Sequence, residues 1–264
     1  MIDVRDVERV RGMRPFLVAH RGGVIGADSP ENSLRAIALA AEHGYAMVEL
    51  DVMEAGDGEP ILMHDGLGIN CGLKERIHNL TSKEITGLRY RASDQHVIAL
   101  EQAVHACASL GLGIMLDKLR NDCAEDGEMS AACLGRVASM IRDAGLGAST
   151  VAIFDTPILR EHLSEVALFP VRKQDIARVA AGEAVALHGE FWFGWGADLR
   201  GDGVANLHAN GAFTIVSINT FHYPKHAHDE LARQDIERLL AAGVDGFQID
   251  SVYEDCFEAS SGEG

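Results

Sequence analysis

The sequence has few of the features that mark secreted, membrane-spanning or disordered proteins. Its five cysteines are an odd number and form no Cys-x-x-Cys pair, so a disulfide framework is not expected. No stretch approaches the roughly 18 uninterrupted apolar residues that a membrane-spanning helix needs. The first residues have mixed charge and lack the apolar segment of a signal peptide. We therefore expect a cytoplasmic protein in a reducing environment.

Basic residues are also scarce. The chain has 23 lysines and arginines against 40 acidic residues, a formal net charge of -17, and no run of basic residues interrupts this excess. Such a surface repels nucleic acid and anionic membranes, so we expect no nucleic-acid partner and no stable membrane insertion. A site for an anionic small molecule would need local positive charge from Arg, Lys or a metal. Nothing in the sequence predicts an oligomeric state.

What is present is typical of a globular α/β protein. Apolar residues make up 47% of the 264 residues and charged residues 24%, a composition that can bury a large core. Short apolar runs alternate with amphipathic helical patterns along the whole chain. Strands are expected at 16–19, 46–52, 113–118, 150–154, 166–171, 186–192, 213–218 and 246–250, and helices at 34–43, 100–110, 128–144, 156–163, 173–182, 202–210 and 229–242.

This alternation predicts the fold class. Strands that alternate with helices form parallel sheets with right-handed crossovers. The eight strands exclude a short hairpin strand at 61–64, and eight favours a closed (β/α)8 TIM barrel over an open sheet. Residues 66–98 are polar and irregular, with a helix-capping signal at Thr81 to Glu84, and we interpret them as a small insertion after the second strand. We expect one domain over 1–264.

Polar residues lie at the carboxyl ends of several predicted strands. In a barrel these ends meet at the rim that carries catalytic residues. Any one of them could be a capping or loop-anchoring residue, but their coincidence on four strands favours a site. They are His20, Arg21, Glu49, Asp51, His64, Asp65, Asp117, Lys118 and Asp250.

Glu49 and Asp51 are candidate metal ligands. Residues two apart in a strand point to the same face, so both carboxylates are expected to face into the barrel. Two such charges repel strongly in a low-dielectric site and need a compensating cation. Oxygen ligands suit Mg²⁺ or Ca²⁺. The alternative is that one carboxylate pairs with Arg21 and no metal binds.

His20 and His64 are candidates for acid and base catalysis. Each follows an apolar strand and precedes a tight turn, beside the carboxylate pair. A lone histidine is often only packed and hydrogen-bonded, but two at matched positions are better explained as a general acid and a general base. Arg21 would grip a phosphate through two parallel hydrogen bonds.

Taken together, these segments resemble the glycerophosphodiester phosphodiesterase family, whose signature reads HRG, PEN[TS], E-x-D-V, D-G-x-P and HD in this order. Several segments in the correct order are far more specific than one short match. The resemblance is dense over 16–118, sparse over 120–212, and returns over 213–250. The matching segments are His20-Arg21-Gly22, Pro30-Glu31-Asn32-Ser33, Glu49-Leu50-Asp51-Val52, Asp57-Gly58-Glu59-Pro60, His64-Asp65, Leu80 to Ile85, Leu100 to Val104 and Gly243 to Asp250.

The resemblance implies a role for each residue. In the family the two histidines act as acid and base, which here are His20 and His64. The Glu/Asp pair and a third acidic residue on the third strand hold Ca²⁺ or Mg²⁺, which implies Glu49 and Asp51 as ligands. An arginine after the first histidine and a lysine on the third strand stabilise the phosphate, which implies Arg21 for the first of these.

The third strand departs from the family pattern. The family places one residue between its acid and its lysine, whereas Asp117 and Lys118 are adjacent here. Both cannot point inward from a regular strand. Either Asp117 is the third ligand and Lys118 is displaced, or Lys118 keeps its place and Leu116 replaces the acid. We favour Asp117 as the ligand, and a β-bulge would bring both side chains inward.

The seventh strand also departs. The family often ends it W-T-x-N, whereas this chain has Ser217 to Thr220, so Asn219 keeps the polar end but the substrate-stacking aromatic is missing. Trp192 or Trp195 could replace it, although ordinary packing of the sixth strand is the favoured explanation of that aromatic run. Asn219 and Trp195 remain candidates for substrate contact. A histidine cluster over 222–228 is better explained as a solvated loop than as a zinc site.

The sequence thus favours hydrolysis of a glycerol-type or sugar-type phosphodiester, a small molecule, with the help of one divalent cation. Two alternatives stay open. Phospholipase D-like enzymes of similar fold transfer the phosphate to an internal hydroxyl and give a cyclic product. A degenerate barrel would bind a phosphodiester without turnover. The intact His20, His64, Glu49 and Asp51 argue against the last possibility.

Overall fold

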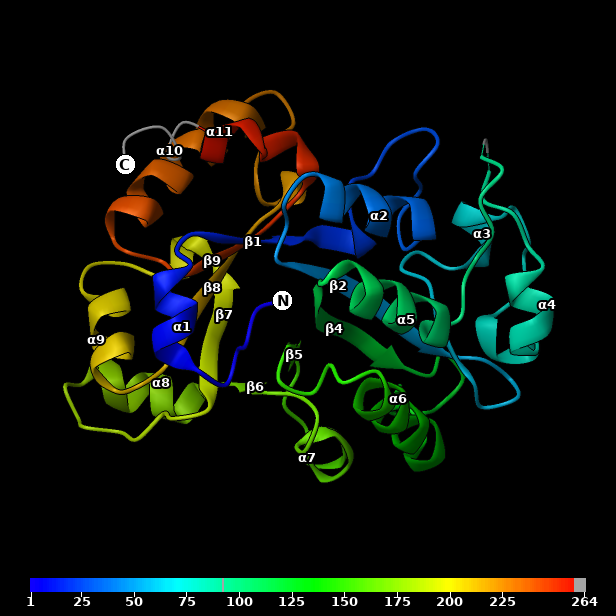
Figure 1. Cartoon of the computed structure of the whole chain (residues 1–264), viewed down its shortest axis with the longest axis horizontal. Coiled ribbons are helices and arrows are strands. Elements are labelled where there is room, and N and C mark those ends of the chain that lie inside the picture. Colours follow the sequence, from blue (N-terminus) through cyan, green and yellow to red (C-terminus); the bar gives the residue numbers. More distant parts are fainter. Residues whose placement is uncertain (92, 259–264) are drawn as a thin grey trace.

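Parallel strands form the centre of the computed structural model, which describes residues 1–91 and 93–258 (Figure 1). Neighbouring strands follow the order β5-β4-β2-β1-β9-β8-β7-β6, and the two ends of this path meet at a parallel bridge between Val151 and Leu168. The sheet is therefore a nearly closed barrel, and the predicted (β/α)8 fold is confirmed. The strands are β1 (Phe16–Ala19), β2 (Met47–Glu54), β4 (Gly113–Arg120), β5 (Thr150–Ala152), β6 (Phe169–Pro170), β7 (Glu190–Trp195), β8 (Phe213–Ile218) and β9 (Gly246–Ile249).

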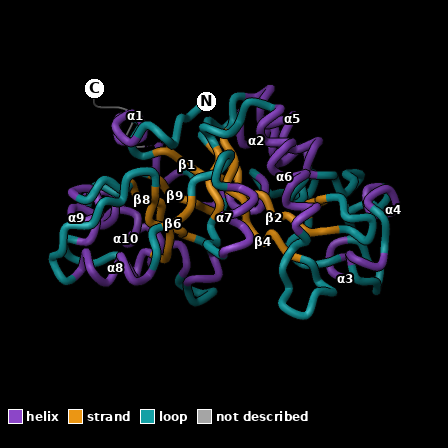
Figure 2. The backbone as a smooth tube through the Cα atoms, turned by 90° about the horizontal axis from the view of Figure 1, so that it is seen from below, coloured by secondary structure: helices purple, strands orange, loops and turns teal. Residues whose placement is uncertain are grey.

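Helices surround this barrel, as the tube view shows (Figure 2). Side-chain caps explain where several begin. The Ser33 hydroxyl accepts a hydrogen bond from Ala36 N at 3.2 Å, and Ser130 does the same for Cys133 N at 3.2 Å. The helices are α1 (Val7–Gly12), α2 (Leu34–Glu42), α5 (Leu100–Leu110), α6 (Ala131–Asp143), α7 (Pro157–Leu163), α8 (Lys173–Ala180), α9 (Gly203–Ala209), α10 (His228–Ala241) and α11 (Asp255–Glu258), with short 3-10 turns η1 (His20–Gly22), η3 (Gly196–Asp198), η4 (Thr220–His222) and η5 (Ser251–Tyr253). No described helix has the length and apolar character needed to cross a bilayer.

Several strand boundaries differ from the sequence prediction, and two strands, β6 and β7, differ by four residues or more in total. The predicted strand 166–171 is reduced to β6, because the amides of Val166 and Ala167 both donate to Leu163 O at the end of α7. The predicted strand 186–192 is instead β7, because Leu187 N donates to Asn210 O and the chain turns before Glu190. Both misplaced segments contain buried apolar residues, so the sequence pattern indicated burial there rather than strand pairing.

The segment after β2 is more regular than the sequence indicated. The hairpin strand β3 (Pro60–Leu62) pairs antiparallel with β2, and α3 (Leu67–Asn70), η2 (Ile77–Asn79) and α4 (Ser82–Thr86) follow. The predicted cap is present, with a reciprocal box between Thr81 and Glu84. Ile77 and Ile85 pack with the hairpin in a hydrophobic cluster of their own. This cluster fixes the loop after β3 against the barrel rim.

Alternation along the strands orders the barrel interior. Met47 belongs to an inner apolar cluster, whereas Val48 and Leu50 pack outward against the helices. Ile2 and Val10 from the N-terminal segment and α1 join the inner cluster, and Figure 1 shows this segment lying over the barrel. Because residues two apart share a face, the side chains that follow Met47 on the inner face are those of Glu49 and Asp51. The fold thus places polar side chains above an apolar floor.

Candidate active site

Glu49 and Asp51 are both fully buried in the middle of β2. One oxygen of each is held: Glu49 Oε2 accepts from Arg21 N at 2.6 Å, and Asp51 Oδ2 accepts from Asn32 Nδ2 at 2.8 Å. The other oxygens, Glu49 Oε1 and Asp51 Oδ1, are buried and accept no hydrogen bond from the described residues. Orphaned buried carboxylate oxygens are unfavourable unless a cation approaches them.

Asp117 completes a group of three carboxylates. It lies opposite Asp51 in the β2–β4 pairing, and one oxygen from each of Glu49, Asp51 and Asp117 lies within 4.8 Å of the others. Burial raises the pKa of Asp51 to about 7, against the hydrogen bond from Asn32, and the charge of Asp117 adds to this rise. Burial and then the charges of Asp51 and Asp117 raise the pKa of Glu49 well above its usual range. This all-oxygen, strongly repelling donor set fits a hard divalent cation such as Mg²⁺ or Ca²⁺.

The backbone after Asp117 forms a bulge. The β2–β4 register shifts between Val52 and Met53, and both Lys118 (φ 62°) and Leu119 (φ 49°) adopt the left-handed conformation. Such residues cost about 1–3 kcal/mol each and persist only where their surroundings hold them. The Lys118 amide donates to the carboxylate of Asp117. The bulge that was left open for this strand is therefore found, whereas the inward position of the Lys118 side chain stays a prediction.

His20 is held by a carboxylate from the last strand. Its Nδ1 lies 2.6 Å from Asp250 Oδ1, and because a carboxylate can only accept, Nδ1 carries the proton. The Nε2 atom of His20 lies 4.0 Å from Glu49 Oε2. Burial raises the pKa of Asp250, but the hydrogen bond and charge of His20 and the Thr220 amide outweigh it and lower the pKa below its usual range. The sequence placed Asp250 on the rim and gave it no partner.

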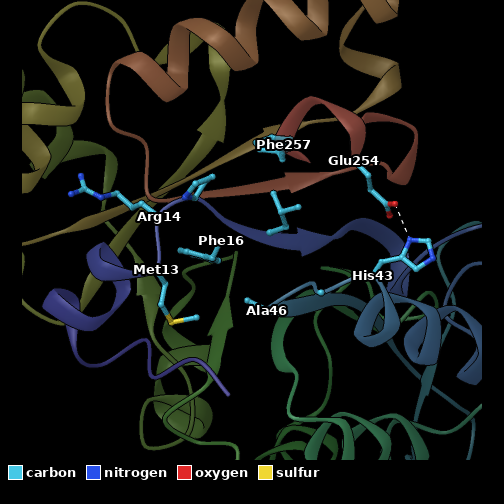
Figure 3. Close-up of a pocket in the computed structure, with 10 residues that line it drawn as sticks. Met13, Arg14, Phe16, His43, Ala46, Glu254 and Phe257 are labelled. Atoms are coloured by element: carbon cyan, nitrogen blue, oxygen red, sulfur yellow. Dashed lines mark hydrogen bonds and ion pairs between the residues drawn. The ribbon is translucent and has the colours of Figure 1, made fainter. Parts of the chain in front are cut away.

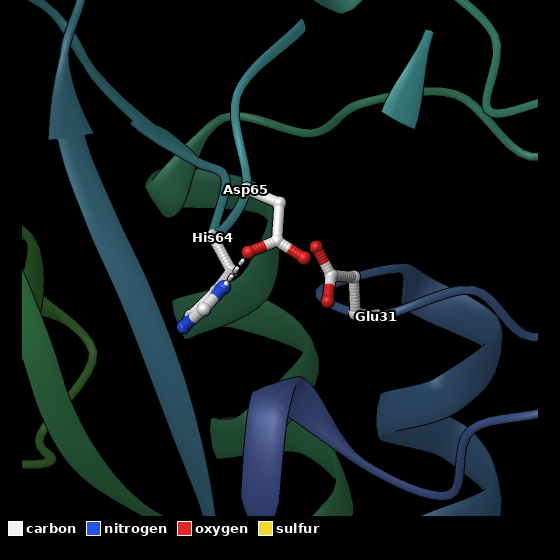
Figure 4. A group of neighbouring side chains, drawn as sticks. All are labelled: Glu31, His64 and Asp65. Atoms are coloured by element: carbon white, nitrogen blue, oxygen red, sulfur yellow. Dashed lines mark hydrogen bonds and ion pairs between the residues drawn. The ribbon is translucent and has the colours of Figure 1, made fainter. Parts of the chain in front are cut away.

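His64 is held in the same way from the hairpin side (Figure 4). Its Nδ1 lies 2.6 Å from Asp65 Oδ1, and the other ring nitrogen points away from Asp65. Glu31 lies beside them, but the Arg21 guanidinium already binds both carboxylates, at 2.9 Å from Glu31 and 3.3 Å from Asp65. Burial, then Arg21 and Lys118, lower the pKa of His64, against the opposing effect of Asp65. The carboxylates of Glu31 and Asp65 therefore hold Arg21 and His64 in place rather than a second cation.

The turn after β1 is unusually constrained. Arg21 itself is left-handed (φ 53°), and the next residues, Gly22 and Gly23, also have positive φ. A Cβ on Gly23 would lie 2.1 Å from the carbonyl oxygen of Ala36, so only glycine fits. Asn32 holds the turn in place, because its backbone N–H donates to Arg21 O at 2.8 Å while its side chain binds Asp51. Asn32 belongs to the PEN segment of the sequence, but no role was predicted for it there.

Aromatic side chains line the opposite part of the rim. Trp195 at the end of β7 packs on His222 with ring centroids 4.6 Å apart, and Phe221 lies 5.9 Å from His20. Trp195 is 54% exposed and Phe221 62% exposed, whereas Trp192 is part of the core. Of the two tryptophans weighed from the sequence, only Trp195 reaches the rim.

Asn219, three residues before His222, is almost completely buried. Its Nδ2 donates to Ser217 Oγ at 2.9 Å and to Gln248 Oε1 at 3.3 Å. The nearby histidines do not converge: His222 stacks on Trp195, while His228 lies 3.1 Å from the Tyr253 hydroxyl. Among the described residues, no group of potential metal ligands includes them.

A cavity of about 580 Å³ lies elsewhere, beside the amino-terminal ends of β1 and β2 (Figure 3). Phe16 and Ala46 line it, and an ion pair of 2.8 Å between His43 Nδ1 and Glu254 Oε2 lies at one side. It is at the opposite end of β1 from His20. In a barrel this end is associated with stability rather than catalysis.

Comparison with known families is consistent with this arrangement. Residues 20–254 match the glycerophosphoryl diester phosphodiesterase family. The chain belongs to this family. The match begins at His20 and extends past Asp250, so it contains all of the residues that form the site described above.

Individual members of the glycerophosphoryl diester phosphodiesterase family are similar over part or all of the chain. The chain is 38% identical to glycerophosphodiester phosphodiesterase 1 of Mus musculus over 113 residues, which cover 39% of this chain and 34% of that relative. It is 33% identical to the glycerophosphoinositol inositolphosphodiesterase of the same organism over 138 residues, 40% of this chain and 25% of the relative. The chain thus spans only about a third or less of the length of these curated relatives.

Solved structures agree over nearly the whole fold. A glycerophosphoryl diester phosphodiesterase structure from Silicibacter pomeroyi superposes with a TM-score of 0.69 at 20% identity and covers 94% of both chains. An Oleispira antarctica phosphodiesterase in complex with the product sn-glycerol-3-phosphate has a TM-score of 0.67 at 18% identity, covering 91% of this chain and 95% of that one. At these identities the similarity establishes the fold.

Proposed function

We propose that this chain hydrolyses a glycerol-type or sugar-type phosphodiester to an alcohol and a phosphomonoester. The observation that carries the proposal is the pairing of two histidines, each held by a carboxylate, with three buried carboxylates on one rim. Membership of the glycerophosphoryl diester phosphodiesterase family supports the reaction class. The sn-glycerol-3-phosphate named as the product of the Oleispira antarctica protein supports a glycerol-type substrate.

Glu49, Asp51 and Asp117 would hold one divalent cation, Mg²⁺ or Ca²⁺. The orphaned oxygens of Glu49 and Asp51 support this assignment, because a cation would satisfy both and relieve the repulsion within the group. When bound, such a cation neutralises negative charge on the phosphate as the transition state forms. Asn32 would hold Asp51 in the orientation that this requires.

His64 is the proposed general base and His20 the proposed general acid. The lowered pKa of His64, which follows from burial, Arg21 and Lys118, keeps its ring neutral and able to accept a proton from the attacking water at Nε2. His20 would act in its doubly protonated form, with Nδ1–H bound to Asp250, and would donate the Nε2 proton to the departing alkoxide, which leaves a neutral ring protonated on Nδ1. Asp250 and Asp65 are positioning residues, because each fixes its histidine through Nδ1 and leaves Nε2 toward the substrate.

Positive charge for the phosphate would come from Arg21 and Lys118. Two carboxylates fix the Arg21 guanidinium in place, and the bulge at Lys118 and Leu119 keeps the lysine beside Asp117. Trp195 is the proposed contact for one alcohol group, since its ring is exposed on the same rim. Asn219 stays a weaker candidate: its amide nitrogen is already bound, but its buried Oδ1 accepts no hydrogen bond within the described part of the chain.

A panel of glycerophosphodiesters and sugar phosphodiesters tests this proposal, with the phosphorus products identified by NMR. The native chain with Mg²⁺ or Ca²⁺ is expected to release a phosphomonoester, and His20→Ala to lose at least about 10²-fold in kcat. His43→Ala is the matched control, because His43 also pairs with a carboxylate but outside the site. A cyclic phosphate product would show that the chain transfers the phosphate to an internal hydroxyl instead of hydrolysing the diester. No turnover of any member would favour a barrel that only binds phosphodiesters.

A further inference from the structure

A depression opens on the rim that carries the candidate active site, between the loops that follow β4 and β5. It has a volume of about 250 Å³. Its apolar lining comes from Leu119, Met129, Phe154, Ile158 and Leu159, and we refer to these five residues as the apolar pocket. Arg120, Asp126 and Glu128 are exposed and lie at its edge, and Lys118, which also lines it, is partly buried.

The apolar pocket has a firm floor. Leu119, Met129 and Leu159 are buried members of the main hydrophobic core, and Ile158 packs against that core. Phe154, two residues after the end of β5, is 47% exposed and forms an open wall. A fixed apolar surface of this kind binds an apolar group by removing both from water.

One wall of the pocket is anchored by a buried acid. Glu54, at the end of β2, accepts from Ser130 N at 2.7 Å through Oε2 and from Ser130 Oγ at 2.6 Å through Oε1. An isolated antiparallel β-bridge between the backbones of Arg120 and Glu128 closes the loop between them. Met129 is therefore held between two fixed points, and the pocket is largely formed before any ligand arrives.

The apolar pocket is continuous with the candidate active site through the bulge on β4. Lys118 lines the pocket, and its charge, after burial and Arg21, contributes to the lowered pKa of His64. The next residue, Leu119, lies in the pocket floor. A phosphodiester with its phosphate beside Lys118 therefore has one ester arm at the pocket mouth. Trp195 lies across the barrel, on β7, near the other arm.

We propose that the apolar pocket binds an alkyl or acyl chain carried by one alcohol group of the phosphodiester. The inference rests on the proposed function and names a substrate class for it: glycerophosphodiesters whose second alcohol is apolar. A volume of about 250 Å³ equals that of roughly eight water molecules, which a chain of about six to eight carbons would fill. A second charged group is disfavoured at the floor, because Leu119, Met129 and Leu159 offer it no polar partner and the charged side chains lie around the edge of the pocket.

The test is a series of glycerophosphodiesters with linear alkyl alcohols from methyl to octyl, assayed on the full chain with Mg²⁺ or Ca²⁺. KM is expected to fall by up to about fourfold for each added methylene until the pocket is filled, with little change in kcat. Phe154→Ser and Ile158→Gln are expected to flatten this dependence and to leave the methyl ester unaffected. Ile69→Ser, a substitution of another exposed apolar residue on α3, is the matched control and should keep the native dependence.

The outcomes separate this inference from the proposed function. Turnover of the methyl ester with a KM that does not depend on chain length overturns the apolar pocket as a chain site and leaves the hydrolase standing. Turnover of no ester overturns the hydrolase, and calorimetric titration with methyl and octyl phosphate then tests the pocket directly. Octyl phosphate should bind the native chain at least about tenfold more tightly than methyl phosphate, and Phe154→Ser should remove most of this preference. Equal affinity for both would overturn the pocket.

Discussion

Replacing Asp250 with asparagine tests how the fold prepares His20 for proton transfer. Asp250 Oδ1 binds His20 Nδ1 at 2.6 Å, while Oδ2 accepts from Thr220 N at 2.7 Å. An asparagine can keep the contact with the Thr220 amide through its carbonyl oxygen. Its NH₂ group would then face Nδ1, so the ring would be bound in the opposite tautomer with the proton on Nε2.

The expected magnitude follows from what the carboxylate does. In the native chain Nδ1 is always protonated and Nε2 is free to carry the transferred proton. In Asp250→Asn no carboxylate stabilises the positive charge that the His20 ring carries when both of its nitrogens are protonated. The contribution of this proton transfer to the rate, about 10²–10⁴-fold, should then be largely lost. We expect kcat to fall by about 10²–10³-fold with KM changed by less than about threefold, because substrate binding does not involve Asp250.

The assay is steady-state kinetics across pH with a glycerophosphodiester, together with thermal unfolding. Asp250→Asn should alter the pH profile of kcat and keep a cooperative unfolding transition near that of the native chain. Glu254→Gln is the matched control, because Glu254 holds His43 in a similar pair outside the site and should leave kcat unchanged. If Asp250→Asn keeps kcat within about twofold of the native value, the positioning role of Asp250 is wrong.

Two further predictions concern stability. Burial raises the pKa of Asp155, but hydrogen bonds from Arg160 and Arg172 lower it overall, so this carboxylate stabilises the fold above its unfolded pKa and loses that effect as pH falls through the lower folded value. Asp155→Asn should cost about 1 kcal/mol in urea unfolding at pH 7, a difference that shrinks below about pH 4; a constant difference down to pH 3 would contradict this. Gly23→Ala should lower the free energy of unfolding by about 3 kcal/mol, since its Cβ would meet Ala36 O at 2.1 Å, whereas Gly12→Ala, with nothing within 4 Å, should be neutral. Equal stability of the two alanine variants would refute the steric argument.

Much of the site could be predicted because it depends on local periodicity. The alternation of Met47, Glu49 and Asp51 on β2 determines which side chains face inward once β2 is a strand, and the strand follows from its apolar pattern. The position of His20 after β1 follows in the same way. The barrel itself follows from the repeated alternation of strands and helices. The roles of these residues and the cytoplasmic location remain predictions.

Other features depend on contacts that no local pattern contains. Asp250 reaches His20 only because β9 pairs with β1 when the barrel closes. The bulge at Lys118 requires consecutive left-handed residues, a conformation with no sequence signal apart from the unusual adjacency of Asp117 and Lys118. Asn32 also has a positive φ, and the sequence indicated it only as one residue of the PEN motif. Local patterns therefore contain neither the long-range pairing nor the left-handed backbone, although a bulge was one of the arrangements left open for β4.

The central claim is that three buried carboxylates hold a divalent cation that the two histidines need for phosphodiester hydrolysis. Its most direct test measures turnover of a glycerophosphodiester by metal-depleted chain, before and after Mg²⁺ or Ca²⁺ is restored, beside Glu49→Gln and the exposed control Glu42→Gln. Turnover should be lost on depletion and restored by the cation in the native chain and in Glu42→Gln, and should stay at least about 10³-fold lower in Glu49→Gln. Undiminished turnover in the depleted chain and in Glu49→Gln would contradict the claim.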